Sequence, residues 1–322
     1  MRSFLNRRIL VFILALFFVL SSSVSASGLS DVALVMHEIS IKTGAPIAEN
    51  FDFNTYKNIA YYGTFPAHDP DGDSISFQLV DKPARGALTI DEQDAAQFVY
   101  TPYENKTGKD SFSYIAIDSN GNESSEATVD IVIERPDTKV NYVDMGDHPA
   151  HNAAIRMAEE NILVGTRMDG EYYFQPELTI NRSEFLVMAM SALGLDKIDC
   201  ISTGFFDDHA IETWVKPYVS SALKAGVIQG KVAENGQIVF MGEDNITVAD
   251  AAVILNNLLS ITDIPVETAS FDISSIPTEA YQSVVNLESV GILQSSAQFM
   301  QTLDRATAAE MLFSALSLND KR

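Results

Sequence analysis

The chain has 322 residues, of which 21 are basic and 44 are acidic, so its formal net charge at pH 7 is −23. This charge argues against nucleic acid or anionic lipid as a partner, whereas it suits a solvated extracellular protein and divalent cations. The single cysteine, Cys200, excludes an internal disulfide, and an exported chain without disulfides fits a bacterial surface better than a eukaryotic secretory route.

The first 26 residues have the pattern of a cleaved signal peptide. Three arginines precede a nearly unbroken apolar run over residues 9–20, and small residues at 24–26 form a cleavage site. The apolar run is short for a membrane-spanning helix, and no later stretch reaches spanning length, so we expect export without a membrane span in the mature chain. Residues 27–39 are expected to be an N-terminal linker. Without the three arginines, 18 basic residues face 44 acidic ones, which gives −26.

Residues 40–136 are expected to form a β-sandwich. Apolar and polar residues alternate with the period of a strand in four segments, at 74–80, 97–100, 111–117 and 127–133. Turn dipeptides that contain glycine punctuate them at 71–72, 85–86, 107–108 and 120–121. Short strands separated by regular turns are typical of all-β sandwiches.

Several motifs in this segment resemble the bacterial Ig-like or cadherin-like modules of surface proteins and adhesins. The motifs are, in chain order, AHDPDGD (67–73), KPARG (82–86), FVYTP (98–102), GKDSFSY (108–114) and DSNGN (118–122). The resemblance implies a Greek-key sandwich and, in many members, bound calcium.

The turn at 69–73 carries the residues expected to hold calcium. Asp69, Asp71 and Asp73 alternate in a turn that contains glycine, and hard cations prefer clustered carboxylate oxygens. Asp118 and Glu49 are candidates for additional ligands from neighbouring loops. The alternative is an Asp-rich turn whose carboxylates cap its own backbone.

After residue 140 the chain repeats itself three times. Val143-Asp144, Phe206-Asp207 and Phe271-Asp272 begin units that are 63 and 65 residues apart, and an amphipathic helix is expected in each. These helices are expected to end at Asn161, Gly226 and Gly291, because Asn and Gly tolerate the left-handed conformation that stops a helix. We place the repeats at 140–197, 203–261 and 268–320.

A second helix is expected in each repeat, with its N-cap at Asn181, Thr247 or Asp304. Glu184 and Asp250 follow their caps by three residues, where an acidic side chain closes a capping box or faces the positive helix end. In repeats one and three an arginine directly follows the cap, at Arg182 and Arg305. An arginine beside free helix N–H groups predicts a compact site for an anion.

This pattern resembles the S-layer homology (SLH) domain. Repeat one carries the match at Asp144, Ala150, Gly165, Phe174, Pro176 and 181–184, whereas repeat two has Val248 in place of the arginine. Repeat three keeps Phe271-Asp272 and Arg305 but has Ser295 and Thr307 at two motif positions. The resemblance implies a mainly α, pseudo-trimeric domain of three repeats, so the whole chain is expected to be multidomain.

The family also implies a ligand, a secondary cell-wall polysaccharide held in grooves between the repeats. Arg182 and Arg305 would receive the carboxylate of a pyruvylated sugar, and Gly165 and Gly230 would let the glycan approach the backbone. Asn181, Glu184 and Trp214 complete the candidate site, although Asn181 acts first as a cap and Trp214 is expected to belong to the core. The groove at Val248 is expected to be weak or silent.

No motif in the sequence indicates catalysis, so an enzyme is not expected. The histidines are scattered, and no nucleophile elbow or phosphate-binding loop is present. The sequence predicts an exported protein at the cell wall, associated with an S-layer, anchored by SLH repeats and displaying an Ig-like module. The alternatives are an adhesin or carbohydrate-binding protein in which the Ig-like module carries the function, or a minor S-layer component. The wall ligand is a polysaccharide or modified peptidoglycan, and the partner of the Ig-like module stays unknown.

Overall fold

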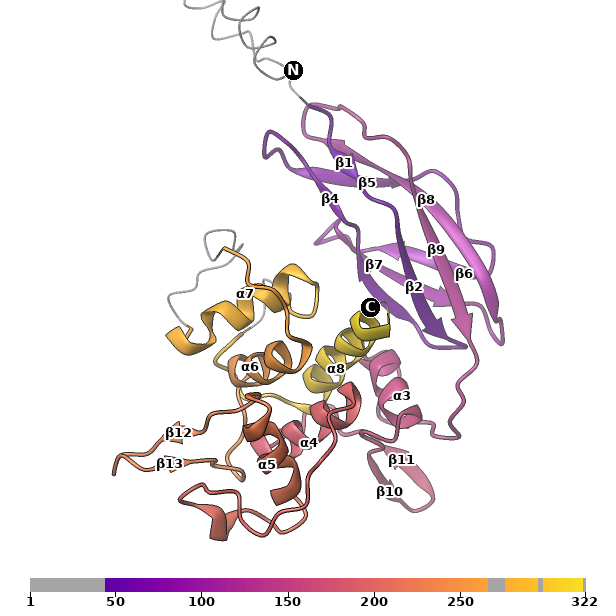
Figure 1. Cartoon of the computed structure of the whole chain (residues 1–322). Helices are drawn as coiled ribbons and strands as arrows, with labels where there is room; N and C mark the ends of the chain where they lie inside the picture. The colour runs from indigo at the N-terminus through magenta and orange to yellow at the C-terminus, as the bar shows by residue number, and fades with distance from the viewer. Residues whose placement is uncertain (1–43, 266–275, 295–297, 321–322) are drawn as a thin grey trace, which may run out of the picture. The chain divides into compact units, whose positions relative to one another are not determined.

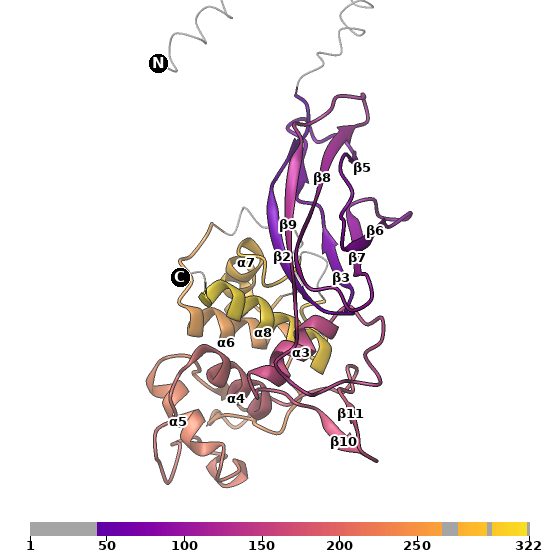
Figure 2. The same cartoon turned by 90° about the vertical axis from the view of Figure 1, so that its right-hand side faces the viewer.

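The computed structural model describes residues 44–265, 276–294 and 298–320 (Figures 1 and 2). The expected signal peptide, the expected linker, Phe271-Asp272 and Ser295 lie outside these residues. Residues 44–48, 67–78 and 115–125 form a small compact unit, and the other described residues form a larger one. None of the described helices is long and apolar enough to cross a bilayer.

The first part of the chain is built of strands that form two main sheets. They are β1 (Ile47–Ala48), β2 (Phe51–Tyr56), β3 (Tyr61–Thr64), β4 (Ala67–His68), β5 (Ile75–Leu79), β6 (Gly86–Ile90), β7 (Gln97–Pro102), β8 (Gly108–Asp118) and β9 (Ala127–Glu134). One sheet has the order β2-β9-β8-β5, the other has the order β3-β7-β6, and β1 pairs with β4. The four strands expected from alternation are confirmed as β5, β7, β8 and β9.

Aromatic side chains fill the space between the two sheets. Strand β9 alternates buried and exposed residues along its length, as a strand with one face in a core should. Phe53 of one sheet stacks on Tyr61 of the other, with ring centroids 3.9 Å apart. Phe98 lies 5.8 Å from Phe112 in an edge-on arrangement that favours the ring quadrupoles. This region is therefore a sandwich with an aromatic core.

The rest of the chain is mainly helical and consists of three similar segments, called units one, two and three from here on. All three lie inside the larger compact unit described above. The elements are α3 (His151–Glu159), β10 (Thr166–Met168), β11 (Glu171–Tyr173) and α4 (Arg182–Leu193); then η2 (Asp208–Ala210), α5 (Lys216–Lys224), β12 (Lys231–Val232), β13 (Ile238–Val239) and α6 (Val248–Leu259); then η5 (Thr278–Ala280), α7 (Tyr281–Ser289) and α8 (Arg305–Asp320). Asn161, Gly226 and Gly291 all have left-handed backbones, with φ of 55°, 75° and 74°, which confirms the expected helix ends.

A ring of three backbone hydrogen bonds joins the three units. The residues just before the N-caps form it: Ile180 N–H donates to Leu303 O, Leu303 N–H to Ile246 O, and Ile246 N–H to Ile180 O, over 3.1, 2.8 and 3.2 Å. All three side chains are buried. Because each unit gives and receives one bond, the ring fixes a pseudo-threefold arrangement.

The helices follow the same cyclic order. Helix α4 packs on α5, α6 packs on α7, and α8 packs on α3, so the second helix of each unit contacts the first helix of another. Helices α4, α6 and α8 also contact one another. Figures 1 and 2 show these three on the inside, with α3, α5 and α7 around them. No unit buries its apolar residues alone, since one continuous core runs through all three.

An aspartate fixes the connector between the helices in the first two units. Asp144 accepts hydrogen bonds from the N–H groups of Phe174 and Gln175, at 2.9 and 2.7 Å. Asp207 accepts the equivalent bonds from Phe240 and Met241, both at 2.8 Å. The carboxylate thereby satisfies two backbone donors at once.

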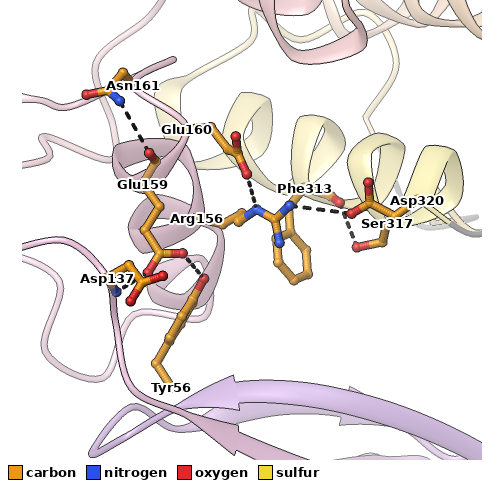
Figure 3. A network of polar contacts seen from close by, with 9 residues as sticks. All are labelled: Tyr56, Asp137, Arg156, Glu159, Glu160, Asn161, Phe313, Ser317 and Asp320. Carbon is orange, nitrogen blue, oxygen red and sulfur yellow. Dashed lines mark hydrogen bonds and ion pairs between the residues drawn. The ribbon is translucent and has the colours of Figure 1, made fainter.

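The turn after β2 contacts the helical region within the larger unit. Asn152, which is 6% exposed, accepts hydrogen bonds from Thr55 and Tyr56 and donates to Ala60 O. The Tyr56 hydroxyl donates to Glu159 over 2.6 Å, as Figure 3 shows. Burial, followed by the hydrogen bond that the Tyr56 hydroxyl donates to Glu159, raises the pKa of Tyr56. Tyr56 and Ile59 belong to the same buried cluster as the helical core.

Two glycines of the β10–β11 region provide a test of this packing. Both have positive φ, 79° at Gly165 and 94° at Gly170, but an added Cβ at Gly165 would overlap the carbonyl oxygen of Tyr173 and press on Tyr142. At Gly170 it would meet nothing within 4 Å. We expect Gly170→Ala to lower the free energy of unfolding by about 1 kcal/mol and Gly165→Ala by about 2–4 kcal/mol. Urea unfolding of both variants measures the difference, and equal losses would contradict the close approach.

Candidate functional site

The N-termini of α4, α6 and α8 lie where one unit meets the next. Each second helix donates its first two N–H groups to the connector of another unit: Arg182 and Ser183 to Asp244 O and Gly242 O, Val248 and Ala249 to Gln301 O and Phe299 O, and Arg305 and Ala306 to Leu178 O and Pro176 O. The third N–H is bound by the cap, Asn181, Thr247 or Asp304. The three predicted caps are confirmed, and Asn181 with Glu184 forms a full capping box.

These bonds correct one part of the predicted anion site. The helix N–H groups beside Arg182 and Arg305 are not free, because the connector and the cap have already satisfied them. A bound anion would therefore have to rely on side chains. The expectation that free helix N–H groups help to hold the anion is wrong, because the connector of another unit and the cap already accept hydrogen bonds from these groups.

Arg182 is engaged in an ion pair across the junction of units one and two. It is 9% exposed, and a terminal guanidinium nitrogen lies 2.7 Å from Asp250 Oδ2. Lys231 on β12 approaches the same oxygen, also at 2.7 Å. Burial opposes ionisation of Asp250, but the two cations outweigh it and lower its pKa. Two positive side chains thus share one carboxylate at this junction.

Arg305 is in a different state at the junction of units three and one. It is 8% exposed, its guanidinium carbon lies 5.3 Å from the centre of the Phe174 ring, and its Nε is buried without a hydrogen-bond partner. In the described part of the chain, no carboxylate lies within ion-pair distance of it. Burial lowers the pKa of Arg305, while Tyr142, Glu184 and Asp144 oppose this from farther away. Arg305 therefore carries a buried positive charge that packs against an aromatic ring.

The junction of units two and three has neither an arginine directly after the cap nor an acidic residue three positions after the facing cap. Val248 holds the position of the arginines and is 5% exposed, and Thr307 holds the position of Glu184 and Asp250. The backbone bonds are the same as at the other two junctions. The three junctions therefore share one backbone geometry and differ only in their side chains.

Other candidates from the sequence have structural explanations. Gly165 and Gly230 both occupy left-handed turns where an added Cβ would overlap neighbouring atoms, which accounts for glycine without a ligand. Trp214 was expected in the core, but it is 54% exposed and donates to Glu212. The core expectation for Trp214 is wrong, because α5 begins only at Lys216 and buries Val215 and Val219 instead.

Three residues at the junctions and connectors were missed by sequence reasoning. The aromatic residues that pack on the connectors are Tyr142 on Phe174 and Phe205 on Phe240, one position before the expected starts at Val143 and Phe206. Lys231 directly follows Gly230, and only the folded hairpin brings it to Asp250. The repeat spacing could have indicated Tyr142 and Phe205, since both are aromatic and lie two residues before an aspartate.

The predicted calcium ligands converge in part, within the small unit. Carboxylate oxygens of Asp69, Asp73 and Asp118 all lie within 4.8 Å of one another. Asp69 Oδ1 accepts hydrogen bonds from the N–H groups of Asp71 and Asp73, whereas its Oδ2 is buried and has no partner. Burial would raise the pKa of Asp118, but hydrogen bonds from Asn122 and Asn120 lower it on balance. The other two predicted ligands, Asp71 and Glu49, are outside this group.

Comparison with known proteins identifies the first part of the chain. Residues 43–132 match the family model of the bacterial Ig domain. No curated protein matches the chain.

Three solved structures each resemble a part of the chain. An endo-fucoidan hydrolase from glycoside hydrolase family 107 is 23% identical over 30% of this chain and 14% of its own length, with a TM-score of 0.25. The SrpA adhesin from Streptococcus sanguinis is 20% identical over 39% of this chain and 83% of its own, with a TM-score of 0.25. Titin domain M7 is 9% identical over 29% and 97%, with a TM-score of 0.20. The family match at residues 43–132 fits a surface or exported protein with an Ig-like module, and a helical region follows it.

Proposed function

We propose that this protein is an exported bacterial surface protein whose helical region anchors it to the cell wall by binding an anionic glycan group, leaving the Ig domain on display. The resemblance of the repeats to SLH domains suggests the ligand class, a wall polysaccharide with a pyruvate ketal or a modified peptidoglycan. The protein is not an enzyme in this proposal.

The observation that carries the proposal is the unpaired guanidinium of Arg305. Burying a charge without a counter-charge has an unfavourable desolvation free energy, and the attraction of a ligand carboxylate that pairs with the guanidinium offsets it. A guanidinium can hold a carboxylate through two parallel hydrogen bonds, which a neutral sugar cannot exploit. The Phe174 ring beside it is fully buried and packs against the guanidinium, so it helps to hold Arg305 in position.

The three junctions are expected to differ in affinity. Repeat one matches the family signature best, so the sequence alone favours Arg182. In the structure Arg182 already has a carboxylate partner in Asp250, and a ligand would have to displace it. We therefore assign the strongest anion binding to the junction at Arg305, a weaker site to Arg182, and none to Val248.

We expect Arg305→Ala to weaken binding of the full mature chain to cell-wall sacculi by at least about tenfold, because one charge-assisted contact pair is lost. Arg182→Ala should weaken binding less, and Arg156→Ala, which removes a partly exposed arginine paired with Glu160, is the matched control. Co-sedimentation with sacculi, before and after removal of the secondary polymer, measures this.

Circular dichroism confirms that each variant is folded, and Arg305→Lys, which keeps the charge but not the fork geometry, should fall between wild type and Arg305→Ala. Wild-type binding by a folded Arg305→Ala chain would contradict the assignment. If the wild type does not bind intact walls, the anchoring role is contradicted and the Ig domain is left as the functional part.

We also propose that calcium binds the Asp69, Asp73 and Asp118 cluster. Three converging carboxylates, one with a buried oxygen that has no partner, have the chemistry of a hard-cation site. The cation would tie the turn at 69–73 to the loop after β8, and so stiffen the Ig domain where these two loops meet.

Calcium should raise the thermal unfolding midpoint of the Ig domain, because a ligand that binds only the folded state adds about 2.7 kcal/mol at a hundredfold excess over its dissociation constant. Asp69→Asn and Asp73→Asn should abolish the shift. Asp71→Asn serves as the control, since its carboxylate is outside the cluster, and it should respond like the wild type. A midpoint that calcium leaves unchanged, measured by scanning calorimetry, would count against the site.

A further inference from the structure

The junction of units two and three, which has Val248 in place of an arginine, opens into a pocket of about 670 Å³. Val248 and Thr307 line it, together with residues of α8, the turn after α7, and strand β3 of the Ig domain. All of these residues belong to the larger unit. The volume is in the range of pockets that hold a small ligand.

The lining of this pocket is polar and contains acids without bases. Its polar side chains include Gln97, Gln294, Gln298 and Gln301, which offer amide donors and acceptors. Asp304 and Glu310 add two carboxylates. None of the described residues that line the pocket is a lysine, an arginine or a histidine. An anionic ligand would meet repulsion here, in contrast to the junctions that hold Arg182 and Arg305.

The two carboxylates differ in the contacts that they make within the protein. Asp304 Oδ1 caps α8 by accepting from Thr307 N–H over 2.8 Å. Glu310 is exposed to solvent and lines the pocket. Loss of hydration beside neighbouring protein atoms, and then repulsion from Asp304, raise the pKa of Glu310 above its ordinary value. A cation placed beside Glu310 would favour its ionised form.

We propose that this pocket binds an organic cation, a ligand that carries a protonated primary amine together with hydroxyl groups, such as an amino sugar unit. The ammonium group would pair with Glu310 and Asp304, and the hydroxyl groups would bond to the glutamine amides. A divalent metal fits less well, because only two of the described lining residues are carboxylates and one of them, Asp304, already caps α8. This site does not depend on the anion site at Arg305.

Glucamine and glucitol provide a matched pair of probes, since they differ only at C1, where glucamine has an ammonium group and glucitol has a hydroxyl group. We expect the full mature chain to bind glucamine at least about tenfold more tightly than glucitol at pH 7, as measured by ligand-observed NMR titration. Glu310→Gln should remove this preference. Asp304→Asn, which retains a good N-cap, should reduce it.

Three further variants make the result specific. Glu279→Gln removes an exposed acid outside the pocket and should leave the preference unchanged. Arg305→Ala should also leave it unchanged, which separates this site from wall anchoring. Val248→Arg restores the cation of the other junctions and should abolish glucamine binding by pairing with the acids. Equal affinity for the two probes, no binding of either, or an unchanged preference in Glu310→Gln would overturn the proposal.

Discussion

The helical region depends on the three backbone hydrogen bonds that join Ile180, Ile246 and Leu303 in a ring. These bonds are buried, so breaking one would leave a donor and an acceptor without partners in an apolar core. They place the residue before each N-cap next to its counterparts in the other units. The start of every second helix is fixed as a result, and so is the position of the side chain that follows each cap.

This constraint explains how one backbone can carry three different chemistries. The connectors satisfy the helix N–H groups at each junction in the same way, so changes of side chain there do not disturb the fold. Arg182, Arg305 and Val248 occupy equivalent positions, as do Asp250, Glu184 and Thr307. The residues at which units two and three differ from unit one therefore change the chemistry of a junction while its backbone hydrogen bonds stay the same. In our account one junction holds a satisfied ion pair, one holds an unpaired cation, and one has become an acidic pocket.

Local features of the sequence predicted local features of the structure well. The caps at Asn181, Thr247 and Asp304 and the left-handed ends at Asn161, Gly226 and Gly291 follow from the few residues around them. The proximity of the Asp69 and Asp73 carboxylates could be predicted because the two residues share a turn. The strands with clear alternation were found, whereas β2, β3 and β6 were not assigned.

Features that depend on distant residues could not be predicted. The N–H groups at Arg182 look free in sequence, because the carbonyl groups of Asp244 and Gly242 that bind them lie about 60 residues away. The pairing of Arg182 with Asp250, and the lack of such a partner for Arg305, follow from which units meet. Trp214 was assigned to the core from its place in the pattern, but helix α5 begins after it. The sequence alone favours Arg182, whereas the ion pair that Arg182 makes with Asp250 leads us to propose Arg305 as the stronger anion site.

We infer that Arg305, rather than Arg182, offers the stronger anion site. The Nε atoms of both side chains are buried without a partner, so their N–H resonances are suitable reporters in arginine-labelled protein. Titration of the mature chain with a hexosamine that carries a 4,6-pyruvate ketal, followed in nitrogen–proton correlation spectra, tests the claim directly. We predict a saturable shift of the Arg305 resonance at ligand concentrations that leave Arg182 unchanged. A shift of the Arg182 resonance at lower ligand concentration than that of Arg305, or no shift of the Arg305 resonance at the highest ligand concentration, would contradict this inference.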